Sequence, residues 1–170
     1  MVLDQQEQSE KLIEEFGRQI LVPGINEEGQ QNISRKKICI IGLGALGTVA
    51  SQYLVRAGVG EIHLVDHDII EKSNLHRQIN YDKDDVGKSK SNTSKHKLKN
   101  INDSTIIKEH SLNFESFIKK NPNNNFDLIF DCTDNHQNKI FSSKYSKANK
   151  ISFVSILSLI HISEPTRHCL

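Results

Sequence analysis

The sequence predicts an α/β fold with a doubly wound, mostly parallel sheet, a leading N-terminal helix, and a C-terminal part of the fold that is missing. Two observations support this prediction. Short apolar runs of strand length alternate with segments of helix length along the chain. The first such run, residues 37–41, leads into Gly42, Gly44 and Gly47 in the spacing G-x-G-x-x-G, and then into a helix-like segment.

The individual elements follow from hydrophobic periodicity and from turn residues. Leu12, Ile13 and Phe16 share one face of an amphipathic helix over residues 4–17, and a short helix is expected over residues 30–34. The predicted strands are residues 37–41, 61–66, 104–109, 126–131 and 151–155. The predicted helices between them are residues 48–57, 86–99, 114–119 and 136–149, and residues 66–78 are expected to form an irregular loop.

The three glycines predict a phosphate cradle. Gly42 allows the tight turn after the strand, Gly44 lets the backbone approach a phosphate, and Gly47 lets the helix pack closely on the strand. The unpaired amides at the start of the helix favour an anion. The glycine pattern alone suits NAD, FAD or ATP equally.

Composition excludes several classes of function. The chain has 170 residues, enough for one domain with a core, and a formal net charge of +1, which gives no reason to expect nucleic acid or an anionic membrane as a partner. No apolar run has membrane-spanning length, and the first residues lack the order of a signal peptide. Cys39, Cys132 and Cys169 are scattered and odd in number, which argues against a disulfide framework. A cytoplasmic protein is expected.

Charged residues follow the predicted strands at the edge where a parallel sheet binds its ligands. Asp66 ends the second strand and Asp68 follows it; Lys90 comes after the next loop, and Asp134 follows the fourth strand. Together they offer a carboxylate for ribose hydroxyls, cations for phosphates and a second carboxylate for Mg²⁺. This set suits a nucleoside triphosphate better than NAD, because a helix N-terminus already satisfies most of a pyrophosphate.

Seven ordered motifs carry a resemblance to a known family. They are Arg18-Gln19, the glycine loop 42–47, Ala57-Gly-Val-Gly60, Asp66-x-Asp68, Ser73-Asn-Leu-x-Arg-Gln78, Val86-Gly-x-x-Lys90 and Asp131-Cys-Thr-Asp-Asn135. Over residues 12–155 the chain resembles the ThiF/MoeB/HesA family, the bacterial relatives of ubiquitin-activating enzymes. The resemblance implies a Rossmann-like, ATP-binding adenylyltransferase domain over residues 1–155. In such enzymes the C-terminal Gly-Gly carboxylate of a ubiquitin-like sulfur-carrier protein attacks the α-phosphate of ATP, and the enzyme is a homodimer.

The resemblance also implies a role for each matching residue. Asp66 would bind the ribose hydroxyls, Asn74 and Arg77 the β- and γ-phosphates, and Lys90 the α-phosphate region. Asp134 would hold Mg²⁺, and Arg18 would reach the γ-phosphate in the neighbouring subunit. The residues implied in nucleotide binding are Gly42, Gly44, Ala45, Gly47, Asp66, Asp68, Ser73, Asn74, Arg77, Lys90, Asp134 and Asn135; those implied in catalysis are Arg18, Asn74, Arg77, Lys90 and Asp134.

Each of these roles has a purely structural alternative. Asp66 could cap its loop, Arg77 could form a surface salt bridge, and Lys90 could be a solvated lysine. For Asp134 the alternative is an N-cap of the following helix, and for Arg18 it is a charge that complements the helix dipole. Cys132, at a strand end, is expected to be a small buried hydrophobe and not a nucleophile.

Some expectations concern what the chain lacks or adds. The family usually carries two Cys-x-x-Cys pairs for structural zinc, but no such pair occurs in this sequence. Residues 156–170 do not continue the α/β pattern, and Ser158–Arg167 resembles the conceptual translation of a sequencing adapter, so we expect a non-native tail. Two rival functions are an NAD-dependent oxidoreductase and an inactive dimerisation partner of the same fold. The first needs no Arg77, Lys90 or Asp134, and the second should have lost them.

Overall fold

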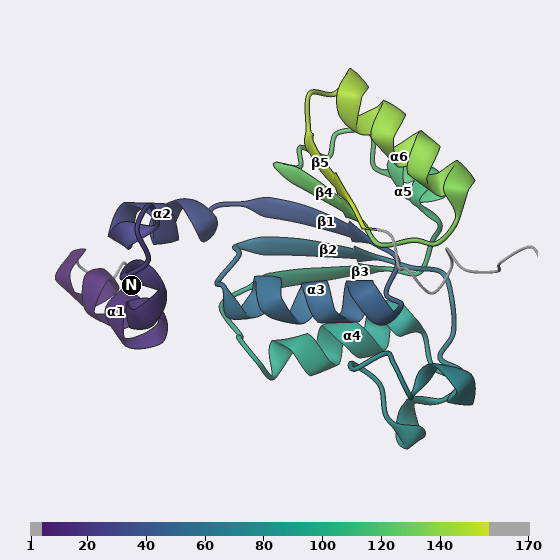
Figure 1. Ribbon diagram of the computed structural model, residues 1–170, viewed down its shortest axis with the longest axis horizontal. Coiled ribbons are helices and arrows are strands. Elements are labelled where there is room, and N and C mark those ends of the chain that lie inside the picture. Colours follow the sequence, from purple (N-terminus) through teal and green to yellow (C-terminus); the bar gives the residue numbers. More distant parts are fainter. Residues whose placement is uncertain (1–4, 157–170) are drawn as a thin grey trace, which may run out of the picture.

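A single five-stranded parallel sheet forms the centre of the protein. The computed structural model describes residues 5–156, and its strands lie in the order β3-β2-β1-β4-β5 (Figure 1). The strands are β1 (Lys37–Ile41), β2 (Glu61–Val65), β3 (Ile106–His110), β4 (Leu128–Asp131) and β5 (Ser152–Ser155), and all pairs are parallel. The strand order runs outward from β1 in both directions, so it reverses between β1 and β4, and the carboxyl ends of these two strands are the position of the ligand crevice in doubly wound folds. The predicted fold class is confirmed.

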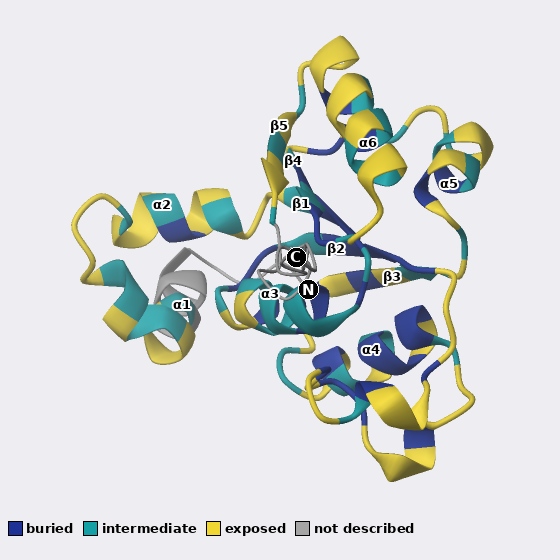
Figure 2. Ribbon diagram, turned by 45° about the vertical axis from the view of Figure 1, so that its right-hand side comes forward, coloured by how far each residue is buried: buried dark blue, intermediate teal, exposed yellow. Residues whose placement is uncertain are grey.

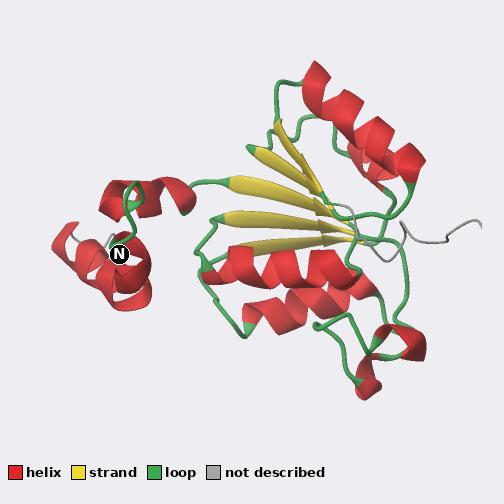
Figure 3. Ribbon diagram, viewed as in Figure 1, coloured by secondary structure: helices red, strands yellow, loops and turns green. Residues whose placement is uncertain are grey.

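Helices cover both faces of this sheet. Figures 1 and 3 show α3 (Ala45–Arg56) and α4 (Lys90–Lys99) on one face and α5 (Phe114–Lys120) and α6 (His136–Ala148) on the other. Helices α1 (Gln5–Ile20) and α2 (Asn26–Ile33) precede β1 and lie beyond the amino ends of the strands. Two short 3₁₀ turns, η1 (Lys72–Asn74) and η2 (Lys83–Asp85), lie in the long segment between β2 and α4. The carboxyl edge of the sheet is therefore free of α1 and α2.

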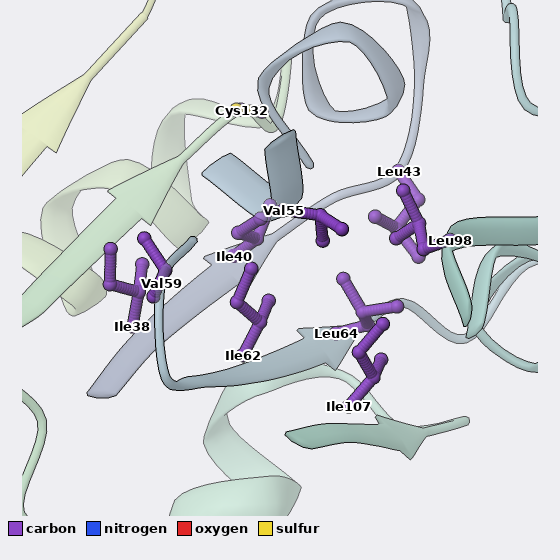
Figure 4. Close-up of a cluster of buried hydrophobic side chains, with 10 residues drawn as sticks. All are labelled: Ile38, Ile40, Leu43, Val55, Val59, Ile62, Leu64, Leu98, Ile107 and Cys132. Carbon is purple, nitrogen blue, oxygen red and sulfur yellow. The ribbon is translucent and has the colours of Figure 1, made fainter. Parts of the chain in front are cut away.

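Alternation along β1 divides the core into two apolar clusters. Ile38 and Ile40 point to the face covered by α3, whereas Cys39 and Ile41 point to the face covered by α5 and α6. Figure 4 draws the first cluster, and Figure 2 shows that the central strands are the most buried part of the sheet. The first cluster consists of Ile38, Ile40, Leu43, Val55, Val59, Ile62, Leu64, Leu98, Ile107 and Cys132. Because Leu43 and Cys132 belong to it, the loops after β1 and β4 are fixed by the core.

A pair of glutamines attaches the N-terminal helices to the sheet domain. The side-chain amides of Gln19 and Gln30 both donate to the carbonyl of Ala57, at 3.1 and 2.9 Å. Gly58 takes a positive φ of 79°, and a Cβ there would lie 2.5 Å from the ring of Phe16. The glycine is therefore required for α1 to pack against the end of α3.

Several predicted element boundaries are wrong, and turn chemistry explains the largest error. The helix predicted over residues 86–99 begins at Lys90, because Gly87 has a φ of 88° and Ser89 caps the helix by accepting from the Asn92 amide. The helix after the glycine loop begins at Ala45 instead of Thr48. Helix α1 runs to Ile20, and the helix expected over residues 30–34 spans Asn26–Ile33. The loop 66–78 is more ordered than expected, since it contains η1 and a bridge from Ile69 to Ser89.

Two further expectations concern the cysteines and the tail. Cys132 is 9% exposed and packs in the core, and burial raises the pKa of its thiol to about 12, so the prediction of a buried hydrophobe is confirmed. The proposed non-native tail lies, apart from Ile156, outside the described residues. Among the helices of residues 5–156, none combines the length and the apolar character needed to cross a bilayer.

Candidate functional site

The glycine loop forms a tight turn between β1 and α3 with free amides at its surface. Gly42 has a φ of 84°, and its amide donates to the Val65 carbonyl at 2.9 Å. A Cβ on Gly47 would lie 1.9 Å from the Gly42 carbonyl oxygen, so only glycine permits this approach. The helix has no side-chain cap at Gly44, and among the described residues nothing accepts a hydrogen bond from the amides of residues 45–47. These amides, with the helix dipole, favour an anion.

Asp66 connects the glycine loop to the loop after β2. Its Oδ2 accepts from the Leu43 amide at 2.6 Å, and its Oδ1 accepts from the Asp68 amide at 2.8 Å. Asp66 is buried, and desolvation raises its pKa, although the two amides act in the opposite direction. Asp66 therefore does cap its loop, as the structural alternative for this residue states. Two of about four acceptor positions on the carboxylate are used, which leaves room for ribose hydroxyls.

Lys90 is held at the same edge by Asp68. The Lys90 amide donates to the Asp68 carbonyl at 3.0 Å, and the Lys90 ammonium lies 2.8 Å from Asp68 Oδ2. The Lys90 side chain is 8% exposed, so it is not the solvated lysine of the alternative interpretation. Asp68 is half-exposed and accessible to solvent. Lys90 is thus a buried cation that is paired with Asp68. An anionic ligand at this edge can compete with Asp68 for the Lys90 ammonium.

The segment from Ser73 to Arg77 presents one cation and one fixed amide. Asn74 is buried, and its Oδ1 accepts from the Glu71 amide at 2.9 Å in a capping box of η1. Arg77 is exposed, and its Nη1 donates to the Ser73 carbonyl at 2.9 Å. Among the described side chains, those of residues 12–156, no carboxylate forms an ion pair with Arg77, which disfavours the surface salt bridge and leaves its charge available to a ligand.

The loop after β4 contacts the glycine turn directly. A Cβ on Gly42 would lie 3.0 Å from Thr133 Cγ2, so Asp134 follows a residue that touches the turn. The buried Asp131 fixes this loop, because its Oδ1 accepts from the Thr133 amide at 2.9 Å and from the Thr133 hydroxyl at 2.7 Å. Asn135 caps α6 by accepting from the amides of residues 137 and 138. The N-cap of α6 is therefore Asn135 and not Asp134, for which an N-cap was the structural alternative.

Arg18 is not brought together with these residues. It lies in the last turn of α1, beyond the amino ends of the strands, whereas the glycine loop and the loops after β2 and β4 lie at the carboxyl ends (Figure 1). Within one chain it cannot reach the crevice. Its position in the last turn also satisfies the helix-dipole alternative.

Sequence reasoning assigned no role to two residues that build the site. Tyr81 is buried, and its hydroxyl donates to the Leu43 carbonyl at 3.0 Å, so it clamps the long loop onto the glycine turn. Burial raises the pKa of Tyr81, which stays a neutral donor. Asp131 organises the loop that carries Asp134. Tyr81 could have been found in the sequence as an aromatic residue within a polar segment. Asp131 could have been found as a charged residue at the end of an apolar strand.

The exposed oxygens at this edge fit a magnesium ion that also binds phosphates. Asp134 is exposed and offers a carboxylate, the hard ligand that Mg²⁺ prefers. Asp66, His67 and Asp68 also bring ligand atoms within 4.8 Å of one another. In that group Asp66 accepts two amides and Asp68 pairs with Lys90. Asp134 stays the ligand that the family resemblance implies, and its carboxylate is exposed.

The sequence pattern of the ThiF family matches residues 16–158 of this chain. The chain belongs to the ThiF family. The resemblance drawn from the seven motifs is thereby confirmed.

Curated relatives carry the same family region within much longer chains. The adenylyltransferase and sulfurtransferase uba4 of Aspergillus niger is 39% identical over 120 residues, which cover 71% of this chain and 25% of that protein. The adenylyltransferase and sulfurtransferase MOCS3 of Caenorhabditis briggsae is 38% identical over 122 residues, covering 71% of this chain and 30% of that protein. The chain thus spans less than a third of the length of these relatives.

Solved structures share the fold of this ThiF-family chain. Escherichia coli tRNA N6-threonylcarbamoyladenosine dehydratase, TcdA, aligns with a TM-score of 0.78 at 25% identity, over 86% of this chain and 61% of the other. Escherichia coli MccB aligns with a TM-score of 0.68 at 31% identity, over 74% of this chain and 38% of the other. TcdA has also been crystallised in complex with ATP.

Proposed function

We propose that this chain is the ATP-binding domain of an adenylyltransferase that activates the C-terminal Gly-Gly carboxylate of a ubiquitin-like sulfur-carrier protein. The molybdopterin and thiamine branches of sulfur transfer fit equally. One observation carries the proposal: the free amides of the glycine loop share one edge of the sheet with Asp66, Lys90, Arg77 and Asp134. Relatives named adenylyltransferases support it, as does the ATP complex of TcdA.

The residues of this edge can be assigned complementary tasks. ATP would supply the activated phosphate, and Mg²⁺ held by Asp134 would offset its negative charge. The amides at the start of α3 would hold the phosphate nearest the loop, and Asp66 would orient the ribose. Asn74 and Arg77 would bind the part of ATP that leaves as pyrophosphate. Lys90 would release Asp68 and bind the α-phosphate region instead. Little proton transfer is needed, because the attacking carboxylate is already ionised.

Arg18 supports a homodimer in this scheme. It lies at the end of the sheet opposite the crevice, so a role at a phosphate requires the crevice of a second copy. Structural zinc is not assigned to these residues, because the sequence contains no Cys-x-x-Cys pair. We place the protein in the cytoplasm, with no nucleic-acid or membrane partner. The unpaired character of Cys39 and Cys132, both buried, is consistent with a reducing compartment.

An NAD-dependent oxidoreductase is the less favoured candidate. The glycine loop and Asp66 would serve NAD as well, but that activity gives no function to Lys90, Arg77 and Asp134. An inactive dimerisation partner is also disfavoured, since these three residues are retained at the same edge.

The proposal is tested by ATP–pyrophosphate exchange with full-length protein and candidate carriers that end in Gly-Gly. We expect exchange that requires the carrier, and none when the carrier's C-terminal carboxylate is amidated. Absence of exchange with every carrier, together with tight binding of NAD, would overturn the proposal.

A further inference from the structure

The side-chain amide of Gln78 is buried beside the glycine loop without the hydrogen bonds that such a group normally makes. Gln78 is 3% exposed, and its Oε1 is a buried oxygen without a partner in the described part of the chain. A methyl group on Gly44 would lie 3.9 Å from Gln78 Nε2, so the other end of the amide faces the loop. In this orientation the donor Nε2 faces the loop, and the acceptor Oε1 is the buried end without a partner.

The position of this amide is imposed by the backbone around it. The Gln78 amide N–H donates to the Asn74 carbonyl at 3.0 Å, and the Gln78 carbonyl accepts from the Tyr81 amide at 3.2 Å. Tyr81 in turn holds the Leu43 carbonyl through its hydroxyl. These hydrogen bonds of the backbone and of Tyr81 therefore fix the position of the Gln78 side chain beside the glycine loop. Within the described residues, hydrogen bonds of its own polar atoms do not contribute.

None of the hydrogen bonds of the described residues uses Gln78 Nε2, so a bound ligand can supply an acceptor for this donor. Gln78 Nε2 is the nearest atom to a methyl group placed on Gly44, and Gly44 precedes the free amides at the start of α3. An anion over those amides offers oxygens that only accept hydrogen bonds. The Gln78 Nε2 group is a donor of matching chemistry, and it is neutral, so it adds direction to the site without adding charge.

We infer that Gln78 binds the phosphate that lies over Gly44, through a hydrogen bond from its side-chain amide. This inference rests on the proposed function for the identity of the ligand, a nucleotide whose phosphate nearest the ribose occupies the glycine loop. That phosphate is present in both ATP and AMP. Arg77, by contrast, is assigned to the phosphates that only ATP carries.

The two assignments predict different patterns of nucleotide affinity. Replacing Gln78→Met keeps the shape of the side chain and removes its polar atoms, so affinity should fall by at least about threefold for ATP and AMP alike, the size of one neutral hydrogen bond. Gln78→Glu places a negative charge against the phosphate and should weaken both by more than about tenfold. Arg77→Ala should weaken ATP far more than AMP. Calorimetry with the full-length protein measures all these affinities.

Thr105→Val provides a matched control. Thr105 Oγ1 is the other buried side-chain oxygen without a partner in the described residues, and it lies just before β3, at the opposite end of the strands. Both Thr105→Val and Gln78→Met remove an unsatisfied buried oxygen at nearly constant volume, so both should keep or raise the melting temperature. Only Gln78→Met should lose nucleotide affinity. If Gln78→Met does not fold, Gln78→Asn shortens the amide by one methylene and should give the same loss.

The outcomes separate this inference from the proposed function. If wild-type protein binds ATP and AMP, and Gln78→Met binds both within twofold of wild type, the inference is wrong and the proposed function stands. If wild-type protein binds NAD and not ATP, the proposed function fails, and an equal loss of NAD affinity in Gln78→Met still supports the phosphate contact. Wild-type protein that binds no nucleotide contradicts both.

Discussion

Replacing Gly47→Ala should destabilise the fold at the glycine loop more than any conservative change nearby. The added methyl would lie 1.9 Å from the Gly42 carbonyl oxygen and 2.9 Å from its carbon, whereas ordinary contacts begin at 3.4 Å. Both clashing groups are backbone, so no side chain can rotate away. Overpacking of this kind costs about 1–3 kcal/mol, and the size of the overlap favours the upper end. For a chain of this length, about 3 kcal/mol lowers the melting temperature by about 6–12 °C.

Thermal unfolding followed by circular dichroism measures this change, and Gly29→Ala is the matched control. Gly29 lies inside α2, where a Cβ would meet its nearest atom at 3.6 Å. Alanine at this position should stabilise the helix by about 0.5–1 kcal/mol. If Gly47→Ala melts within 1 °C of wild type, the close packing of α3 on the turn is not what requires a glycine here.

Three further predictions concern binding, catalysis and pH. Gly44 has an ordinary φ of −77°, so Gly44→Ala should keep the melting temperature but weaken nucleotide binding, because the methyl occupies the approach of the phosphate. Arg77→Ala and Asp134→Ala should each slow adenylation by at least about a hundredfold in pyrophosphate exchange, the effect of losing one group that stabilises the transition state. Burial lowers the pKa of His63 from 6.5 to about 4, so the folded protein binds fewer protons than the unfolded chain between these values. Stability should therefore be full above pH 6.5 and fall towards pH 4, by up to about 3 kcal/mol.

Each of these predictions has a result that contradicts it. Equal nucleotide affinity of wild type and Gly44→Ala would show that no phosphate lies on the loop. A slowing of less than threefold in Arg77→Ala or Asp134→Ala would show that the residue is misassigned. The pH effect is checked by urea unfolding at several pH values, where His63→Gln should flatten the curve; an unchanged slope in that variant would assign the titration to other groups.

The fold could be predicted because its signals are local. The apolar run of β1 and the glycine spacing after it specify a strand, a turn and a helix within about a dozen residues, and the structure contains all three. The boundaries that failed depend on backbone conformations that composition does not reveal. Gly87 could have continued a helix in the sequence, but its positive φ delays α4 until Lys90.

The positions of the candidate site residues could be predicted in part for a similar reason. Strand ends place Asp66 and the loop of Asp134 at one edge, so sequence and topology together could bring them near the glycine turn. The hydrogen bonds that fix the edge come from side chains distant in sequence, such as Tyr81, whose hydroxyl reaches Leu43. Nothing in the sequence spacing reports that contact, nor that the Gln78 amide lacks a partner.

Every role proposed for these residues requires that the carboxyl edge of the sheet binds ATP. Calorimetric titration of full-length protein with MgATP and with NAD tests this claim most directly. We expect saturable binding of MgATP that is lost in Gly44→Ala, and weak or absent binding of NAD. Tight binding of NAD without binding of MgATP would contradict the account.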